Sequence, residues 1–177
     1  MKSKKKNVEL VVLVNSSGKK TGIAEKMEVH EKGWLHRAFS IFIFNSKGEM
    51  LLQQRADTKY HFGGLWTNAC CSHPRPGEKI TAAAKRRLME ELGISTKLSM
   101  LHSIQYCFHD SKSGLTEHEF DYILTGNYND AIKMNPDEVK SVKWLSMTAL
   151  STELSRYPQK FTPWFKLIMR QKPLAEK

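Results

Sequence analysis

Five side chains of this 177-residue sequence are typical ligands of a transition metal: His30, His36, His73, Glu117 and Glu119. Glu117 and Glu119 stand two positions apart in a segment with a strand-like pattern, so both carboxylates leave the same face of a strand. His118 lies between them and points the other way. A Glu-x-Glu pair or a single histidine has ordinary structural explanations, so only the gathering of all five side chains would make a metal site.

The segment from Ser72 to Ile94, SHPRPGEKITAAAKRRLMEELGI, resembles a Nudix box with two substitutions. The pattern of that family is G-x5-E-x7-R-E-U-x-E-E-x-G-U, where U is an aliphatic residue. The residues in register are Glu78, Arg86, Leu88, Glu90, Glu91, Gly93 and Ile94. Ser72 replaces the first glycine, and Arg87 replaces the glutamate of the R-E pair. Because Arg87 puts a cation where a metal ligand is expected, the resemblance implies a site that holds a diphosphate better than it hydrolyses one.

Thr81 to Leu92 is the best helix pattern in the chain, and Gly93 ends it. Arg87 and Glu91 share a face of this helix, whereas Glu90 falls on a neighbouring row and Leu88 and Leu92 form the apolar side. A surface ion pair is the common explanation of an arginine beside a glutamate. The register of the box favours a site instead, with Glu91 holding Mg²⁺ and Arg87 contacting the same diphosphate.

Four further motifs resemble type 1 isopentenyl-diphosphate isomerases, in the order of that family. They are His30 with Trp34-Leu35-His36-Arg37-Ala38-Phe39-Ser40, then Trp66-Thr67-Asn68-Ala69-Cys70-Cys71-Ser72-His73-Pro74, then Glu117-His118-Glu119, then Thr162-Pro163-Trp164. With the altered box they cover nearly the whole chain after the basic N-terminus. The resemblance implies a Nudix fold, no flavin, and interconversion of isopentenyl and dimethylallyl diphosphate in isoprenoid biosynthesis.

The resemblance also implies a role for each matching residue. Cys71 and Glu119 match the two catalytic residues, and Cys70 falls on a variable position. Tyr106 matches a tyrosine on the proton-donating side, and Trp164 matches an aromatic residue that faces the hydrocarbon.

Two cation sites and a diphosphate site follow from the same matches. The side-chain ligands of one tightly bound divalent ion would be His30, His36, His73, Glu117 and Glu119. Glu91 and the backbone carbonyl of Cys71 would bind the Mg²⁺ that arrives with the substrate. The cationic residues around the diphosphate would be Lys26, Arg55, Lys59 and Arg87. The donor set of the tight site suits Zn²⁺, Mn²⁺, Fe²⁺ or Co²⁺.

The reaction explains why these residue types occur together. Moving a carbon–carbon double bond requires a proton to be added at one carbon and removed from another, through a tertiary carbocation. Cys71 and Glu119 can transfer these protons from opposite sides of a thin hydrocarbon. The ring face of Trp164 can stabilise the cation by roughly 2 kcal/mol when desolvated. Which of Cys71 and Glu119 donates stays open, because the reaction is reversible.

Two other functions compete with the isomerase. A Nudix hydrolase of a nucleoside diphosphate derivative would share the fold, but it would normally need an acid at position 87. A non-catalytic metal-binding or nucleic-acid-binding module would use the net charge of +10, yet it would leave the pair of Cys71 and Glu119 unexplained. Ordinary structural roles also remain for Lys59 and Arg55 as surface cations and for Tyr106 and Trp164 as core packing.

The bulk composition limits the class of protein. A hydrophobic content of 40% and a charged content of 26% are ordinary for a globular protein, and no apolar run is long enough to span a bilayer. The three cysteines make a poor disulfide framework, so we expect a reducing compartment, the cytoplasm by default. Basic residues do not alternate with aromatic ones in a stripe, so nucleic acid is not an expected partner. We expect a monomer or weak dimer.

The elements that must position these residues are strands with a few separated helices, which indicates an α+β fold or a three-layer α/β/α sandwich. Strand patterns cover Val8–Asn15, Leu35–Phe44, Met50–Arg55, Trp66–Cys71, Lys97–Phe108, Leu115–Tyr128 and Pro136–Trp144. Asn45–Gly48 predicts a hairpin between the second and third of them, and residues 110–114 a hairpin between the fifth and sixth. Helical patterns follow at Met147–Arg156 and Thr162–Gln171. The Nudix resemblance selects a three-layer α/β/α sandwich with a mixed sheet, formed by one domain over residues 1–177 in which residues 1–6 are a flexible basic tail.

Overall fold

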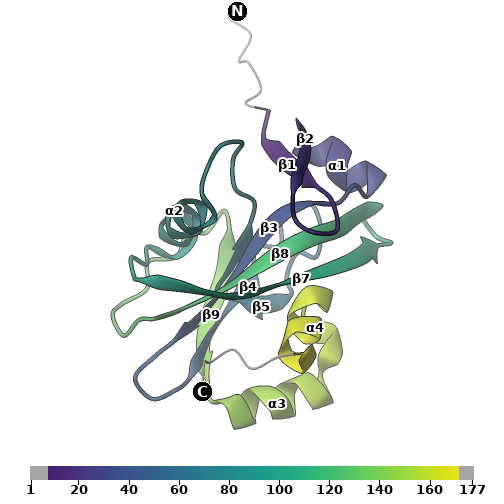
Figure 1. Cartoon of the computed structure of the whole chain (residues 1–177). Coiled ribbons are helices and arrows are strands. Elements are labelled where there is room, and N and C mark those ends of the chain that lie inside the picture. Colours follow the sequence, from purple (N-terminus) through teal and green to yellow (C-terminus); the bar gives the residue numbers. More distant parts are fainter. Residues whose placement is uncertain (1–7, 172–177) are drawn as a thin grey trace, which may run out of the picture.

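The computed structural model describes residues 8–171, which form a nine-stranded mixed sheet with helices on both faces (Figure 1). The strands are β1 (Leu10–Val14), β2 (Lys20–Glu25), β3 (His36–Phe44), β4 (Met50–Arg55), β5 (Trp66–Asn68), β6 (Cys70–Ser72), β7 (Leu98–Asp110), β8 (Leu115–Asn127) and β9 (Val139–Leu145). The helices are α1 (Lys26–Lys32), α2 (Ile80–Leu92), α3 (Met147–Arg156), the 3-10 helix η1 (Pro158–Lys160) and α4 (Pro163–Gln171). The tail predicted over residues 1–6 lies outside the described residues.

Strand β3 is the centre of the sheet. It pairs in parallel with β8 from His36–Glu119 to Phe44–Asn127, and antiparallel with β6, where Ser40 lies opposite Cys71. β8 also forms the long antiparallel hairpin with β7. These pairings bring the three motifs around His36, Cys71 and Glu119 onto adjacent strands.

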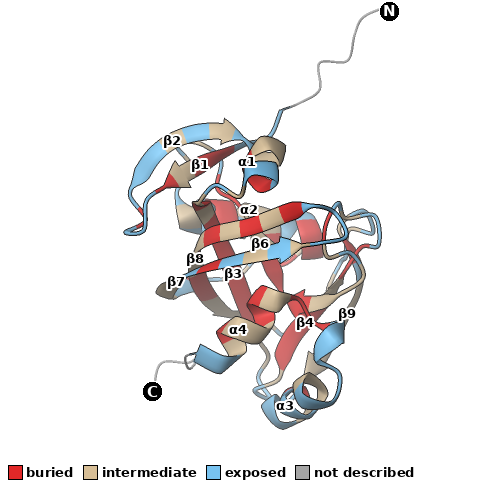
Figure 2. Cartoon of the chain, turned by 90° about the vertical axis from the view of Figure 1, so that its right-hand side faces the viewer, coloured by how far each residue is buried: buried red, intermediate tan, exposed pale blue. Residues whose placement is uncertain are grey.

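Alternation along β3 separates two hydrophobic cores. Phe39, Ile41 and Ile43 pack with Leu88 and Leu92 of α2. Phe42, on the other face, packs with Leu150 of α3 and with Trp164, Phe165 and Ile168 of α4. Figure 2 shows the buried residues along the central strands and on the helix faces turned toward them, while β2 is mostly exposed. The predicted three-layer α/β/α sandwich with a mixed sheet is confirmed.

Most predicted elements are present, with small shifts at their ends. Helix α2 ends where expected, because Gly93 adopts the left-handed conformation, with φ 65°, and its N–H caps the last turn. The hairpin across residues 110–114 is also confirmed. None of the helices within residues 8–171 combines the length and the apolar character that a membrane span requires.

One local prediction is wrong, one is confirmed only in part, and two elements were not predicted. Trp66–Cys71 is not one strand, because β5 pairs with β4 whereas β6 pairs with β3. The hairpin across Asn45–Gly48 is present, but β3 and β4 pair only at Phe44–Met50, because β4 takes β5 and β9 as its main partners. Helix α1 and strand β2 were not predicted at all. Helix α1 is only seven residues long, and β2 lies at the sheet edge with little apolar alternation to reveal it.

Candidate metal and diphosphate site

One pocket gathers most of the predicted site residues. Its lining includes the predicted residues Lys26, Arg55, Lys59, Cys71, His73, Arg87, Tyr106, Glu117, Glu119 and Trp164. Tyr60, His61 and Ser72, to which the sequence assigned no role in the site, line it as well. His30, His36 and Glu91 are buried and do not line the pocket.

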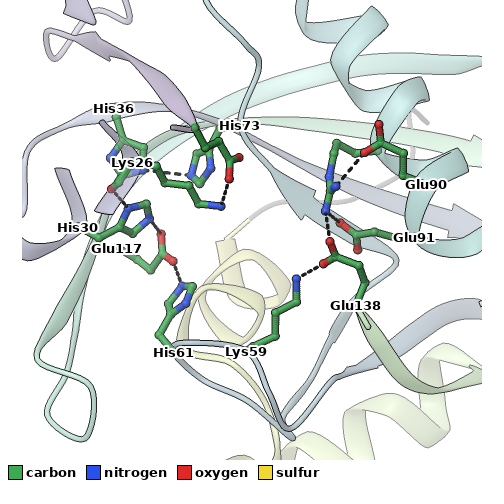
Figure 3. Close-up of polar contacts among 12 residues, drawn as sticks. Lys26, His30, His36, Lys59, His61, His73, Glu90, Glu91, Glu117 and Glu138 are labelled. Carbon is green, nitrogen blue, oxygen red and sulfur yellow. Dashed lines mark hydrogen bonds and ion pairs between the residues drawn. The ribbon is translucent and has the colours of Figure 1, made fainter. Parts of the chain in front are cut away.

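The five predicted metal ligands form one buried cluster. Each of His30, His36, His73, Glu117 and Glu119 offers a ligand atom, and these atoms all lie within 4.8 Å of one another. The register of β3 and β8 sets His36 opposite Glu119, and α1 supplies His30. In Figure 3 the three histidines and Glu117 converge on one point. His118 lies outside the cluster and contacts the Gly33 carbonyl oxygen through Nδ1 at 2.9 Å, as its opposite orientation on the strand requires.

The geometry of the histidine rings fits a divalent metal. Nδ1 of His30 lies 2.6 Å from the carbonyl oxygen of Lys26, and Nδ1 of His36 lies 2.9 Å from that of Trp34. A ring that donates Nδ1–H to a carbonyl presents the lone pair of Nε2 inward, which is how metal-ligating histidines are commonly held. Nε2 of His36 lies 3.1 Å from Nε2 of His73. Two ring nitrogens at this distance are in a favourable position when both bind the same cation.

Protonation in the cluster also suits a metal. Burial, together with the neighbouring His36, lowers the pKa of His73 well below its usual value, so this ring is neutral at pH 7. Burial and the charge of Glu119 raise the pKa of Glu117, but the interactions with His30 and His61 outweigh them, so the pKa of Glu117 is lowered. Burial lowers the pKa of His30, but the hydrogen bond and charge of Glu117 outweigh it, so the pKa of His30 is raised. A neutral imidazole and an ionised carboxylate are the forms that bind metal ions, so the shifts of His73 and Glu117 favour metal binding. The raised pKa of His30 reflects its interaction with Glu117, and His30 would have to be neutral to bind a metal ion.

The adjacent cysteines point to opposite sides of the sheet. Cys70 is buried in the core beneath α2, whereas Cys71 lines the pocket, because successive strand residues alternate. Burial raises the pKa of the Cys71 thiol to about 12. Across the strands, the Tyr106 hydroxyl donates a hydrogen bond to Glu119. The guanidinium of Arg55 lies 5.6 Å from the ring centroid of Trp164, which forms part of the pocket wall.

The residues of the box form ion pairs along α2. Nε and Nη2 of Arg86 each donate to Glu78 at 2.8 Å, so this pair is bidentate. Nη2 of Arg87 donates to Glu91 at 2.7 Å, so the two residues share a helix face as predicted and also form the ion pair that was the alternative explanation. Nη1 of Arg87 also donates to Glu90 at 2.8 Å, so Glu90 is a partner of Arg87 as well, although it lies on a neighbouring row of the helix. The guanidinium fork of Arg87 spans both neighbouring rows of the helix.

Glu138 is the main residue that sequence reasoning missed on this side of the pocket. Its carboxylate accepts a hydrogen bond from Arg87 at 3.1 Å and forms an ion pair with Lys59, as Figure 3 shows. Two of the cations assigned to a diphosphate are therefore already bridged by a carboxylate. Glu138 stands just before β9 in no recognisable motif, and only the fold brings it to Arg87.

His61 and Tyr60 were also missed, on the metal side of the pocket. Nε2 of His61 contacts Glu117, and burial lowers the pKa of His61 to about 3. The ring of Tyr60 stacks on His61 with 4.3 Å between centroids, and burial raises the pKa of Tyr60 to about 12. Lys26 reaches Glu9 at 3.0 Å and lies 5.2 Å from the centroid of Tyr60. His61 is 56 residues away from Glu117 in the sequence, so no spacing rule connects the two and only the fold brings them together.

Comparison with known proteins agrees with this geometry. A family model described as the NUDIX domain matches residues 34–165. The chain is similar to a solved structure of a Deinococcus radiodurans protein, with a TM-score of 0.75 and 18% identity over 92% of this chain and 98% of that one. It is also similar to a solved MutT protein from Methanosarcina mazei, with a TM-score of 0.63 and 18% identity, covering 77% of this chain and 91% of that one. At such identities these structures establish the fold alone.

Closer relatives define a narrower family. The isopentenyl-diphosphate Delta-isomerase of Halorhodospira halophila is 42% identical over 171 residues, which are 96% of this chain and 98% of that protein. The protein of the same name from Serratia proteamaculans is 48% identical over 163 residues, which are 92% of this chain and 90% of that protein. The chain therefore belongs to the Nudix family and, within it, to the isopentenyl-diphosphate Delta-isomerases.

Proposed function

We propose that this protein interconverts isopentenyl diphosphate and dimethylallyl diphosphate, in isoprenoid biosynthesis. The observation that carries the proposal is the placement of Cys71, Glu119 and Trp164 in one pocket that also contains Arg55, Lys59 and Arg87. Thiol, carboxyl and aromatic groups suit a short hydrocarbon that gains and loses a proton. The cations suit a diphosphate.

Cys71 and Glu119 are the two proton-transfer residues. In the first step one of them, in its protonated form, gives a proton to a terminal carbon of the double bond, which leaves a tertiary carbocation. In the second step the other takes a proton from the neighbouring carbon, and the double bond re-forms one position along. Tyr106 is hydrogen bonded to Glu119 and holds that carboxyl group toward the pocket. The ring of Trp164 stabilises the positive charge between the two steps without bonding to it.

His30, His36, His73, Glu117 and Glu119 hold one divalent ion tightly, and three imidazoles with two carboxylates suit Mn²⁺, Zn²⁺, Fe²⁺ or Co²⁺. When bound, the ion supplies positive charge beside Glu119 and lowers the basicity of that carboxylate. The protein residues do the rest, because His36 and His73 fix the orientation of Glu119 from the adjacent strands.

The diphosphate binds at the opposite side of the pocket. Lys59 and Arg87, which share the partner Glu138, lie on that side, whereas Lys26 lies beside the cluster (Figure 3). With Arg55 they all line the pocket and supply its positive charge. Glu91 and the backbone carbonyl of Cys71 bind the Mg²⁺ that accompanies the substrate. No flavin takes part in this reaction, because both steps move only protons.

Hydrolysis is the rival reaction of this fold. The side chain of Arg87 stands where the Nudix pattern has a glutamate, and it is ion-paired with Glu90, Glu91 and Glu138. A cation there cannot bind a metal ion that would activate water, so the substitution favours binding of the diphosphate over its cleavage.

The remaining features concern the protein as a whole. We propose one domain over residues 1–177, a monomer or weak dimer, and a cytoplasmic location. Cys70, Cys71 and Cys107 are all free thiols, which supports a reducing compartment. Neither a nucleic acid nor a membrane is an expected partner.

The decisive assay follows isopentenyl diphosphate with the purified protein and Mg²⁺. We expect conversion to dimethylallyl diphosphate, and loss of conversion after prolonged treatment with a chelator. Nucleotide sugars and dinucleotides, supplied in parallel, should release no phosphate. Phosphate release from those compounds without any isomerisation would refute the proposed function.

A further inference from the structure

A chain of buried hydrogen bonds runs behind Cys71, away from the pocket. It begins at the start of α4, where the Thr162 hydroxyl donates to the Thr67 hydroxyl at 3.0 Å, and the Thr67 hydroxyl donates in turn to Oδ1 of Asn68 at 3.0 Å. It continues through Cys71 to Ser40 on β3 and to Asp121 on β8. Apart from Cys71, every member has an exposed fraction of 0%.

The orientation of the Asn68 side chain is fixed. Its amide nitrogen donates to the carbonyl oxygens of Ile41 at 3.1 Å and Cys70 at 2.9 Å. Oδ1 must therefore face the other way, where Sγ of Cys71 lies 3.0 Å from it. Asn68 thus offers the thiol an acceptor and no donor.

Ser40 presents the same kind of group from the other side. Its single hydroxyl hydrogen is donated to Oδ2 of Asp121 at 2.7 Å. The oxygen of Ser40 lies 3.4 Å from Sγ of Cys71, so it can only accept from the thiol while Asp121 takes its hydrogen. The thiol has a single hydrogen, so Asn68 and Ser40 are alternative acceptors for it. Together, these two oxygens on different strands limit the positions that the sulfur and its hydrogen can take relative to the pocket.

Packing alone does not account for a serine and an aspartate here. Asp121 lies on the strand face that also carries Ile123, within a core of Phe42, Leu52 and Phe165. A buried carboxyl group in such surroundings costs free energy unless it is hydrogen bonded, and Oδ1 of Asp121 has no hydrogen-bond partner. Apolar residues would fill the same volume at lower cost.

We propose that Ser40 and Asp121 are positioning residues, which aim the Cys71 thiol at the substrate by fixing the Ser40 hydroxyl as an acceptor for it. The proposal rests on the proposed catalytic role of Cys71. Neither residue lines the pocket, so neither contacts the substrate. Their effect falls on the proton-transfer step and leaves diphosphate binding unchanged.

The experiment compares four variants of the full chain by kcat, KM, tightly bound metal and melting temperature. Ser40→Ala and Asp121→Ala should lower kcat roughly 10- to 100-fold with KM unchanged, because a displacement of about 1 Å at a reacting group can cost about 100-fold. Asp121→Asn keeps an oxygen acceptor for Ser40 and should retain at least about half of kcat, if the acceptor is what matters. Ile123→Val is the matched control, since it removes one buried methylene opposite Ser40 and should leave kcat unchanged.

Wild-type kcat in Ser40→Ala would overturn the proposal, as would an Asp121→Asn variant as slow as Asp121→Ala. A loss of kcat in Ile123→Val equal to that in Ser40→Ala would also overturn it, because general destabilisation would then explain both. If Ser40→Ala does not fold, Ser40→Cys replaces it, with a reduced kcat supporting the proposal and a wild-type kcat overturning it. Cys71→Ala separates this proposal from the proposed function, because full activity in that variant would refute the role of Cys71 itself.

Discussion

The two sides of the pocket bind charge in different ways. On one side, the candidate metal-ligand cluster of His30, His36, His73, Glu117 and Glu119 is buried, and its donor atoms lie within 4.8 Å of one another. Only His73, Glu117 and Glu119 of this cluster line the pocket. On the other side, a network of Lys59, Arg87, Glu90, Glu91 and Glu138 is partly exposed, and opposite charges are paired within it. Figure 3 shows the two groups apart, on either side of the pocket.

This difference indicates that one side suits an ion that stays bound and the other suits a ligand that exchanges. In the cluster, Nε2 of His30 and Oε2 of Glu117 are buried 3.3 Å apart and have no other hydrogen-bond partner among the described residues, which is costly unless a cation completes their coordination. The network needs no resident cation, because Lys59 and Arg87 are already paired with the carboxylates of Glu91 and Glu138. An arriving diphosphate can take over these two cations from the carboxylates. The cluster therefore suits a resident ion, and the network suits a ligand that enters and leaves in every turnover.

The largest expected effect belongs to the thiol beside the cluster. Cys71→Ala should lower kcat by about 10²–10⁴-fold, because one positioned proton-transfer group contributes that much. Cys70→Ala should keep most of the activity, since Cys70 lies in the core under α2 and not in the pocket. Steady-state kinetics of both variants, with melting temperatures as the control for folding, make the comparison. Equal losses in the two variants would mean that the thiols have been assigned to the wrong sides of the sheet.

The second prediction contrasts the two cation sites directly. His36→Ala should lose the tightly bound metal, by more than about 100-fold in affinity, because loss of even an outer-sphere partner costs about 10–100-fold. Glu91→Gln should keep that metal and instead require a higher Mg²⁺ concentration for activity. Metal content after dialysis, measured by mass spectrometry, checks the first effect, and a Mg²⁺ titration of the rate checks the second. If the His36→Ala variant retained the metal, the proposed difference between the two sides of the pocket would be wrong.

The smallest effect should come from Glu138→Gln. Removing this carboxylate frees Lys59 and Arg87, so inorganic pyrophosphate should bind roughly two- to fivefold more tightly, in keeping with about 0.2–1 kcal/mol for an exposed ion pair. Isothermal titration calorimetry without Mg²⁺ measures this affinity. Weaker binding would mean that Glu138 helps to hold the ligand and does not compete with it.

The pKa of Glu138 leads to a prediction about the stability of the fold at acidic pH. Burial raises the pKa of its carboxyl group, but Lys59 and Arg87 outweigh that effect, so the folded pKa lies below the unfolded one. The ion pairs therefore stabilise the fold above the unfolded pKa, and this contribution is lost as the pH falls through the folded pKa. Glu138→Gln should flatten the dependence of melting temperature on pH in that acidic range, with little change in slope near neutral pH. An unchanged acidic slope would show that the pair contributes nothing measurable.

The sequence predicted most of the fold because its signals are local. The helix pattern before Gly93 and the alternation of Leu115–Tyr128 each reflect one element and its solvent exposure, and both elements are present. Strand partners were harder to predict. Nothing in Trp66–Cys71 shows that Asn68 and Cys70 join different neighbouring strands, because pairing depends on distant residues.

The residues of the candidate site also fall into those that the sequence predicted and those that it missed. The five metal ligands were predicted from motifs, and the structure brings all five together. Glu138, His61 and Asp121 were missed, because each lies in no motif and acts through a neighbour that only folding supplies. Sequence patterns identified residues that would touch the metal or substrate, and largely failed for residues that hold those side chains in place.

The most direct test of the central claim is one sample of isopentenyl diphosphate with the protein and Mg²⁺ in D₂O, followed by proton and phosphorus NMR. We expect deuterium to enter the hydrocarbon while dimethylallyl diphosphate forms, and the diphosphate signals to stay intact. This result would place the chemistry at the thiol and carboxyl groups and leave the box helix with binding alone. Appearance of free phosphate, with no deuterium in the hydrocarbon, would contradict the account.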